Sequence, residues 1–376
     1  MCGIFGITEN NKEVINKSLS LTSYRGPDYN DVWSDENITL GHSLLSITSS
    51  AENGRQPWIT ENKNVLIYNG EIFNYYDLIA QYKGKFNPKT TCDTELLAWL
   101  LENKSIEDVN DNILDSMHAY AFYNSRDKTL ILSRDHAGIK PLFFSEVHSG
   151  IIFGSEIKGI VNQISNANKI DRLALACTAF VGFNVLRQTL FSKILKVLPG
   201  ETLVYDLKNK KIKNFHRTFA KPLSNYKYRS EEFFTETEEA VERSTIGIRK
   251  FGMFLSGGID SSLIAKTLKN KLGNIDTFTN YIFPSEIINN EDLNSDAKVA
   301  KIFSKEYSMN HHEIKITPDI VSNVWDQSIK FMEEPRYNWN MPMYYFTNKI
   351  LSENDVVVTM SGDMGDELFG GYDKYY

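Results

Sequence analysis

The sequence predicts two domains of different fold class: an α+β first half built from packed antiparallel sheets, and an α/β second half built on a doubly wound parallel sheet. Its length of 376 residues suggests two domains, since domains usually contain about 100–200 residues. Short apolar runs separated by turn residues fill the first half, whereas strands and helices alternate in the second. A polar, lysine-rich stretch lies between them, so we predict domains at residues 1–207 and 229–376 joined by a linker at 208–228.

Apolar runs of strand length and two helices make up the first half. Leucines at helical spacing, with Asp93 as a cap, predict a helix over residues 93–102, and another helix is expected to begin at Glu156. Turn-forming residues separate the runs, which predicts sheets packed face to face with helices outside. The predicted strands cover residues 4–7, 38–45, 65–68, 119–123, 130–133, 142–144 and 151–153.

Helices and strands alternate regularly in the second half. This order is typical of a parallel sheet covered by helices on both faces. The predicted helices cover residues 230–249, 259–272, 292–305, 319–332 and 343–351, and the predicted strands cover 251–255, 277–283, 312–316 and 356–360.

Composition excludes several classes of function. The net charge of −7 argues against a surface-wide nucleic-acid site. No run of about 20 apolar residues exists to span a membrane, and the N-terminus lacks the features of a secretory signal. The only cysteines are Cys2, Cys92 and Cys177, too few for a disulfide framework, so we expect a cytoplasmic protein with no nucleic-acid or membrane partner.

Cys2 is the first candidate for catalysis. Removal of Met1 would make it N-terminal, and an α-amine, which titrates near about pH 8, can take the thiol proton and create a thiolate nucleophile. The side-chain amide of Asn69 and the backbone N–H of Gly70 can together form an oxyanion hole. The alternatives are a cysteine that merely falls at position 2 and an Asn-Gly hairpin turn.

Residues 254–262 (FLSGGIDSS) form the second candidate site, between a predicted strand and a predicted helix. Glycines allow close approach of the backbone to an anion, and the following helix presents unpaired N–H groups. The alternative is a plain glycine turn, and the sequence lacks the Gly-Lys-Ser/Thr of a Walker loop. The pattern predicts a phosphate-binding loop with additional hydroxyl donors from Ser256, Ser261 and Ser262.

The third candidate site is the acidic, glycine-rich loop at residues 361–372 (SGDMGDELFGGY), which follows a predicted strand. Its carboxylates, Asp363, Asp366 and Glu367, suit a Mg²⁺ ion carried by ATP or a base for an incoming amine. The alternative is a solvated acidic loop. Because ligands of doubly wound sheets bind at the carboxyl ends of strands, we favour a ligand site.

Four motifs of the first half, residues 1–6 (MCGIFG), 24–28 (YRGPD), 68–74 (YNGEIFN) and 133–142 (SRDHAGIKPL), resemble the glutaminase domain of the glutamine-dependent asparagine synthetase family. That domain is an N-terminal-nucleophile hydrolase, with two antiparallel sheets stacked between helices in an αββα sandwich.

This resemblance implies roles for individual residues of the first half. Cys2 would attack the side-chain amide of glutamine and release ammonia. Asn69 and Gly70 would stabilise the oxyanion, and Glu71 and Asp93 would hold the α-amine of glutamine.

The second half resembles the ATP-pyrophosphatase domain of the same family. Asp363 would then be a catalytic acidic residue, and Asp260 and Asp366 would hold magnesium and pyrophosphate. The implied ATP-binding residues are Leu255, Ser256, Gly257, Gly258, Asp260, Ser261, Ser262, Ser361 and Gly362.

The resemblance also implies substrates and a reaction. Aspartate would attack ATP to give an acyl-adenylate, and ammonia from glutamine would convert this intermediate to asparagine. Two alternatives stay open: amidation of another carboxylate, and a nucleotide-binding protein with a degenerate glutaminase domain. A homodimer is left open as the assembly.

The chain departs from the family pattern in two places. Leu44 stands where the family normally has an arginine that grips the α-carboxylate of glutamine, a bidentate contact that leucine cannot make. Arg25 and Arg55 are the candidates to replace it. The chain also stops at Tyr376, where family members usually continue, so we expect a synthetase domain that is truncated.

Overall fold

The structure is a computed structural model that describes residues 1–376 apart from 168, 220–228, 284–290, 337–339 and 373–376. The chain divides into two compact units. The first contains Met1–Ser224 together with Glu333–Tyr337, and the second contains Asn225–Met332 together with Asn338–Tyr376.

Two six-stranded antiparallel sheets form the first unit, with strand orders β10-β8-β9-β1-β3-β2 and β12-β11-β7-β6-β5-β4. The first sheet contains β1 (Gly3–Ile7), β2 (Tyr29–Ser34), β3 (Thr39–Leu44), β8 (Phe143–Val147), β9 (Gly150–Gly154) and β10 (Leu195–Lys196). The second contains β4 (Trp58–Ile59), β5 (Val65–Ile72), β6 (Ser116–Asn124), β7 (Thr129–Arg134), β11 (Glu201–Asp206) and β12 (Lys211–Arg217).

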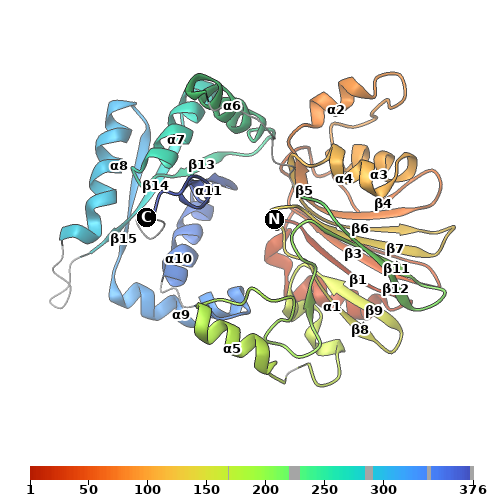
Figure 1. Ribbon diagram of the computed structural model, residues 1–376. Helices are drawn as coiled ribbons and strands as arrows, with labels where there is room; N and C mark the ends of the chain where they lie inside the picture. The colour runs from red at the N-terminus through yellow and green to blue at the C-terminus, as the bar shows by residue number, and fades with distance from the viewer. Residues whose placement is uncertain (168, 220–228, 284–290, 337–339, 373–376) are drawn as a thin grey trace. The chain divides into compact units, whose positions relative to one another are not determined.

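Alternation of side chains along each strand separates three apolar layers in this unit. Ile4 and Val65 face the core between the two sheets. Phe5, the next residue along β1, packs against α1 on the outer face of the first sheet, and Leu66 packs under α2–α4 on the outer face of the second. Figure 1 shows these helices on the two sides of the stacked sheets. The predicted αββα sandwich is confirmed. Its helices are α1 (Lys12–Leu21), α2 (Tyr75–Gln81), α3 (Asp93–Asn103), α4 (Ile106–Asn112) and α5 (Arg172–Val181).

The second unit is built on a parallel sheet with strand order β15-β14-β13-β16. Apolar clusters lie on both faces: Met253 and Leu268 belong to one, and Phe278 and Leu351 belong to the other. The predicted doubly wound α/β architecture is confirmed. Its strands are β13 (Phe251–Phe254), β14 (Asp276–Ile282), β15 (Asn310–Ile316) and β16 (Val358–Met360), and its helices are α6 (Ser230–Arg243), α7 (Ile259–Leu272), α8 (Ser295–Glu306), α9 (Pro318–Met332), α10 (Asn340–Glu353) and α11 (Gly365–Phe369).

Some predicted elements differ from the structure. The helix expected at Glu156 is only the 3₁₀ turn η2 (Ile157–Gly159), where Gly159 packs so closely on Phe5 that a Cβ would lie 2.2 Å from the ring. The helix predicted over residues 230–249 ends at Arg243, before Gly247 adopts a φ of 158° that no helix allows.

The predicted linker at 208–228 contains regular structure. Residues Lys211–Arg217 form β12, which pairs with β11 at the edge of the second sheet, and lysines are typical of such edge strands. Residues 220–228 of the predicted linker lie outside the described residues. In the part of the chain that the structure describes, no helix is long and apolar enough to cross a membrane.

Candidate active sites

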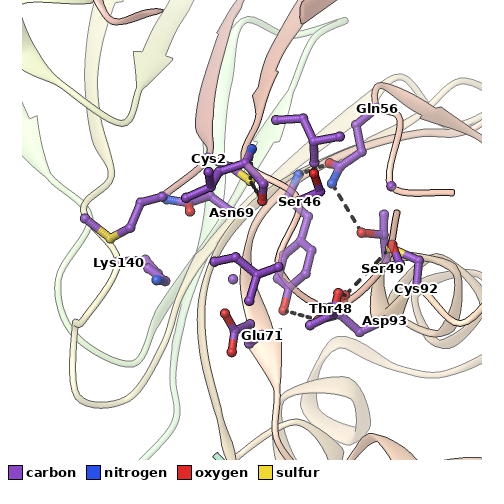
Figure 2. Close-up of a pocket in the computed structure, with 18 residues that line it drawn as sticks. Cys2, Ser46, Thr48, Ser49, Gln56, Asn69, Glu71, Cys92, Asp93 and Lys140 are labelled. Atoms are coloured by element: carbon purple, nitrogen blue, oxygen red, sulfur yellow. Dashed lines mark hydrogen bonds between the residues drawn. The ribbon is translucent and has the colours of Figure 1, made fainter. Parts of the chain in front are cut away.

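The first site is a pocket of the first unit, beside the start of β1. Figure 2 shows its side chains. It brings together residues that lie far apart in the sequence: the N-terminus, the end of β3, the middle of β5 and the start of α3. Its lining includes all five residues predicted there, Cys2, Asn69, Gly70, Glu71 and Asp93, together with Met1, Leu44, Thr48, Lys140 and others.

Cys2 is held both at its thiol and at its backbone carbonyl. The Leu45 N–H donates to Sγ at 3.4 Å, and Arg25 Nε donates to the Cys2 carbonyl oxygen at 2.9 Å. Burial raises the pKa of the thiol and lowers the pKa of the Met1 α-amine to about 5. The Met1 amine is therefore mainly neutral at pH 7, and the neutral form of an amine is the one that can accept a thiol proton.

Asn69 and Gly70 lie in the interior of β5, paired with Ala119 and His118, so the hairpin-turn interpretation is excluded. The Asn69 side chain is 1% exposed, and its Nδ2 has no hydrogen-bond partner among the described residues. A buried amide N–H without a partner is costly and suggests a donor reserved for a ligand. At Gly70, a Cβ would lie 2.3 Å from the Met117 carbonyl oxygen, so only glycine fits.

Two buried carboxylates lie across this pocket. Burial raises the pKa of Glu71 to about 7, although Lys140 lowers it in part. Asp93 is fixed by hydrogen bonds from Tyr68 Oη and the Ile72 N–H, both at 3.1 Å. A cationic ligand would be favourable here, because it would compensate charges that are removed from water.

The pocket contains a single described arginine or lysine side chain, that of Lys140. Leu44 lines the pocket and is 4% exposed. Neither predicted replacement for the family arginine lines it. Arg25 is paired with Glu156 at 2.7 Å, and Arg55 lies over the Tyr29 ring at 4.9 Å. The pocket therefore offers no guanidinium group to a carboxylate.

The cavity of this pocket is small while Met1 is present. Its volume is about 30 Å³, and Met1 is part of its wall. This volume holds only about two water molecules. Removal of Met1 would enlarge the pocket and expose the amine of Cys2 in the same step.

The second site is a cavity of about 1230 Å³ in the second unit. It lies at the carboxyl ends of β13 and β16, which are neighbours in the sheet. The loop after each strand contributes: a Cβ on Gly362 would lie 2.8 Å from the Ser261 backbone nitrogen, and one on Gly365 would lie 2.4 Å from the Asp260 carboxyl carbon. The two motifs singled out in the sequence therefore form one site.

The phosphate-type loop precedes α7, whose N-cap is Gly258. Gly257 has a φ of 83°, and a Cβ there would lie 2.7 Å from the Ala300 backbone nitrogen, so glycine is required. Ser256 Oγ and Ser261 Oγ are hydrogen-bonded at 2.9 Å, which holds both hydroxyls at the helix N-terminus. This arrangement suits an anionic group.

Most residues predicted for ATP or metal line this cavity, but two do not. The exceptions are Gly257, which packs against α8, and Ser262, whose N–H bonds back to the Gly258 carbonyl inside α7. The residues that line it are Leu255, Ser256, Gly258, Asp260, Ser261, Ser361, Gly362, Asp363 and Asp366.

Sequence reasoning missed several lining residues, including Asn280, Asp296, Tyr344 and Asn348. Asn280 lies near the carboxyl end of β14, the neighbour of β13, so the rule that ligands bind at strand ends could have found it. Tyr344 and Asn348 lie one helical turn apart on α10.

The carboxylates at this site fit a magnesium ion that arrives with phosphates. Asp260 and Asp366 both line the cavity. The described residues contain no group of three or more His, Cys, Asp or Glu side chains able to hold a metal alone. Mg²⁺ commonly binds through about one or two carboxylates and the phosphates of its substrate, so the two aspartates are sufficient.

Comparison with known proteins matches the two halves of the chain to two domain families. Residues 1–216 match the family model of the glutamine amidotransferase domain, and residues 233–376 match that of asparagine synthase. The chain is 28% identical to a putative glutamine-hydrolysing asparagine synthetase 2 of Methanocaldococcus jannaschii over 99% of this chain and 76% of that protein. It is 28% identical to glutamine-hydrolysing asparagine synthetase 1 of Bacillus subtilis over 100% of this chain and 59% of that protein.

Among solved structures, the chain is similar to the B. subtilis glutamine phosphoribosylpyrophosphate amidotransferase in complex with ADP and GMP. The TM-score is 0.40 at 17% identity, covering 78% of this chain and 70% of that one.

Proposed function

Because the chain belongs to the family that combines a glutamine amidotransferase domain with an asparagine synthase domain, we propose that it amidates aspartate with ATP and with ammonia released from glutamine at Cys2. The observation that carries the proposal is the buried Asn69 amide without a partner, in the same pocket as Cys2 and two carboxylates. The chain spans 59% to 76% of the length of two relatives named asparagine synthetase, so the activity of the whole protein is part of the proposal.

The first half-reaction is glutamine hydrolysis. After removal of Met1, the α-amine of Cys2 takes the thiol proton, and Sγ attacks the side-chain amide carbon of glutamine. The oxyanion accepts hydrogen bonds from Asn69 Nδ2 and the Gly70 N–H. Ammonia leaves with the proton returned by the amine, and water then hydrolyses the thioester to glutamate.

The second half-reaction activates the acceptor. A carboxylate oxygen of aspartate attacks the α-phosphorus of ATP, pyrophosphate leaves, and ammonia then displaces AMP from the acyl carbon to give the amide. Ser256, Ser261 and the N–H groups at the start of α7 would hold the pyrophosphate. Asp260 and Asp366 would hold magnesium, which supplies positive charge to the leaving group.

Product formation tests this function directly. The chain is incubated with ATP, Mg²⁺ and aspartate, and with either glutamine or ammonium, and asparagine, AMP and pyrophosphate are quantified. We expect asparagine with both nitrogen donors. ATP consumption that requires a different carboxylate would overturn aspartate as the acceptor, and binding of ATP without turnover would favour the nucleotide-binding alternative.

Leu44 leads to a prediction about glutamine affinity. Replacing Leu44 with arginine is expected to lower the KM for glutamine about 10- to 100-fold, because a charge-assisted bidentate contact contributes about 1.5–3 kcal/mol. Leu44→Met is the apolar control and should leave the KM unchanged. An unaltered KM in Leu44→Arg, in a protein of normal thermal stability, would mean that another group already binds the α-carboxylate.

Glu71 leads to a prediction about pH. Its pKa of about 7 is far above the ordinary value, so the carboxyl is neutral below pH 7 and cannot pair with an ammonium group. The KM for glutamine is therefore expected to rise as the pH falls from 8 to 6, approaching about tenfold per pH unit below the pKa. Steady-state kinetics across this range measure it. In Glu71→Gln the KM should be higher and nearly independent of pH, and a slope that persists would assign the titration to another group.

A further inference from the structure

Glu333 comes from the second half of the sequence but belongs to the first unit. It follows α9 directly. Its carboxylate accepts hydrogen bonds from the backbone N–H groups of Ile157 at 2.7 Å and Lys158 at 2.6 Å, and its side chain is 8% exposed. Its φ of 62° is rare for a residue other than glycine, so these contacts must offset an unfavourable backbone conformation.

A second carboxylate anchors the same segment. Glu334 accepts a hydrogen bond from the Leu190 N–H at 2.8 Å and pairs with Lys196 at 2.9 Å. Two consecutive residues are therefore fixed by groups on different loops of the first unit. Of these two residues, only Glu333 bonds to Ile157 and Lys158, which directly follow the Arg25 partner Glu156.

A continuous series of charged side chains connects Glu333 to the backbone carbonyl of Cys2. Lys158 Nζ lies 3.6 Å from Glu333 and 2.7 Å from Glu156. Glu156 pairs with Arg25 at 2.7 Å, and Arg25 Nε donates to the Cys2 carbonyl at 2.9 Å. Arg25 and Glu156 are almost completely buried, so their charges depend on these few partners.

We propose that Glu333 is a positioning residue for Cys2. By fixing the Ile157–Lys158 backbone and the Lys158 ammonium, it holds Glu156, and through it Arg25, in the geometry that orients the Cys2 carbonyl. A residue next to a chain terminus is otherwise poorly ordered, and a shift of about 1 Å in a reacting group can cost about 100-fold in rate. This inference rests on the proposed glutaminase, which would then require a residue outside the matched amidotransferase domain at 1–216.

The test uses Glu333→Gln and Glu333→Ala in the complete chain. Glutamine turnover is measured, together with the rate of Cys2 alkylation by iodoacetamide across pH, located by peptide mass spectrometry. We expect kcat for glutamine to fall about 5- to 20-fold with a KM within twofold of the parent, because Glu333 does not line the glutamine pocket. Alkylation of Cys2 should change in rate and in pH midpoint.

Glu201→Gln is the matched control. Glu201 is a buried carboxylate of the same unit that pairs with Arg187 at 2.5 Å and accepts the Leu198 N–H at 2.9 Å, with no link to Arg25. The Glu201→Gln substitution should leave the rate and the pH midpoint of Cys2 alkylation unchanged. Stable Glu333 variants with parental turnover and alkylation, or a change in KM alone, would overturn the proposal. A parent chain that fails to hydrolyse glutamine would instead refute the glutaminase, and alkylation would still test Glu333.

Discussion

Replacing Cys2 with alanine is expected to reduce ammonia release from glutamine by at least about 10³-fold, because the proposed thioester forms on its Sγ. Amidation with ammonium should continue at the parental rate, since the proposed ATP site is the cavity of the second unit, and none of its lining residues belongs to the first. Glutamate release and asparagine formation from ammonium are the two measurements.

Cys92→Ala is a matched control for this substitution. Cys92 lines the same pocket, but burial raises the pKa of its thiol to about 11, so it is not a nucleophile at neutral pH. Its variant should retain most of the glutaminase activity. Residual glutaminase in Cys2→Ala above about a hundredth of the parental rate would contradict the proposed chemistry.

A permanent extension before Met1 tests the role of the free amine separately. The extension leaves the thiol in place but removes the neutral amine and keeps the small pocket filled. Glutaminase should be lost, and cleavage of the extension to leave an N-terminal Cys2 should restore it. Retention of activity in the extended protein would mean that another base activates the thiol.

Replacing Asp260 with asparagine is expected to reduce ATP-dependent amidation about 10²- to 10³-fold with either nitrogen donor, while glutamine hydrolysis continues. Asp260 lines the cavity where the phosphate-type loop meets the acidic loop, and in the proposed function its carboxylate would hold the magnesium of ATP. Pyrophosphate release reports the first chemical step directly.

Asp296→Asn is the control for this second substitution. Asp296 is another carboxylate in the wall of the cavity, in the first turn of α8, and it lies outside both loops. Its loss should change the rate less than about threefold. Equal effects of the two substitutions would indicate that the cavity needs only its overall negative charge and would remove the specific role of Asp260.

Local patterns were sufficient where structure is determined locally. Helix α7 covers Ile259–Leu272, as the spacing of its apolar residues and the preceding glycines predicted. Both signals depend only on residues within or next to the helix. The doubly wound sheet followed from the alternation of elements. In the first half, the strand runs predicted packed sheets with helices outside, but they did not reveal which strands pair across more than a hundred residues, as β1 and β9 do.

Residues brought in by long-range contacts were not predicted. Asn280, Tyr344 and Asn348 join the cavity of the second unit through the sheet order and the packing of α10. The pairing of Glu333 with the backbone at Ile157 joins positions that are 176 residues apart. Leu44, by contrast, was recognised in the sequence as a departure from the family arginine. The structure adds that no arginine is among the described residues that line the pocket.

The assignment of Glu333 and Glu334 to the first unit has a consequence for biosynthesis. A ribosome makes about 5–20 residues each second, and domains generally fold as they emerge, N-terminal first. The first unit cannot be completed in this way, because two carboxylates that anchor to it, Glu333 and Glu334, are made after residues 225–332 of the other unit. A nascent or prematurely terminated chain would therefore contain the amidotransferase fold without its last anchor, and the nucleophile would reach its final setting only when nearly the whole chain has been translated.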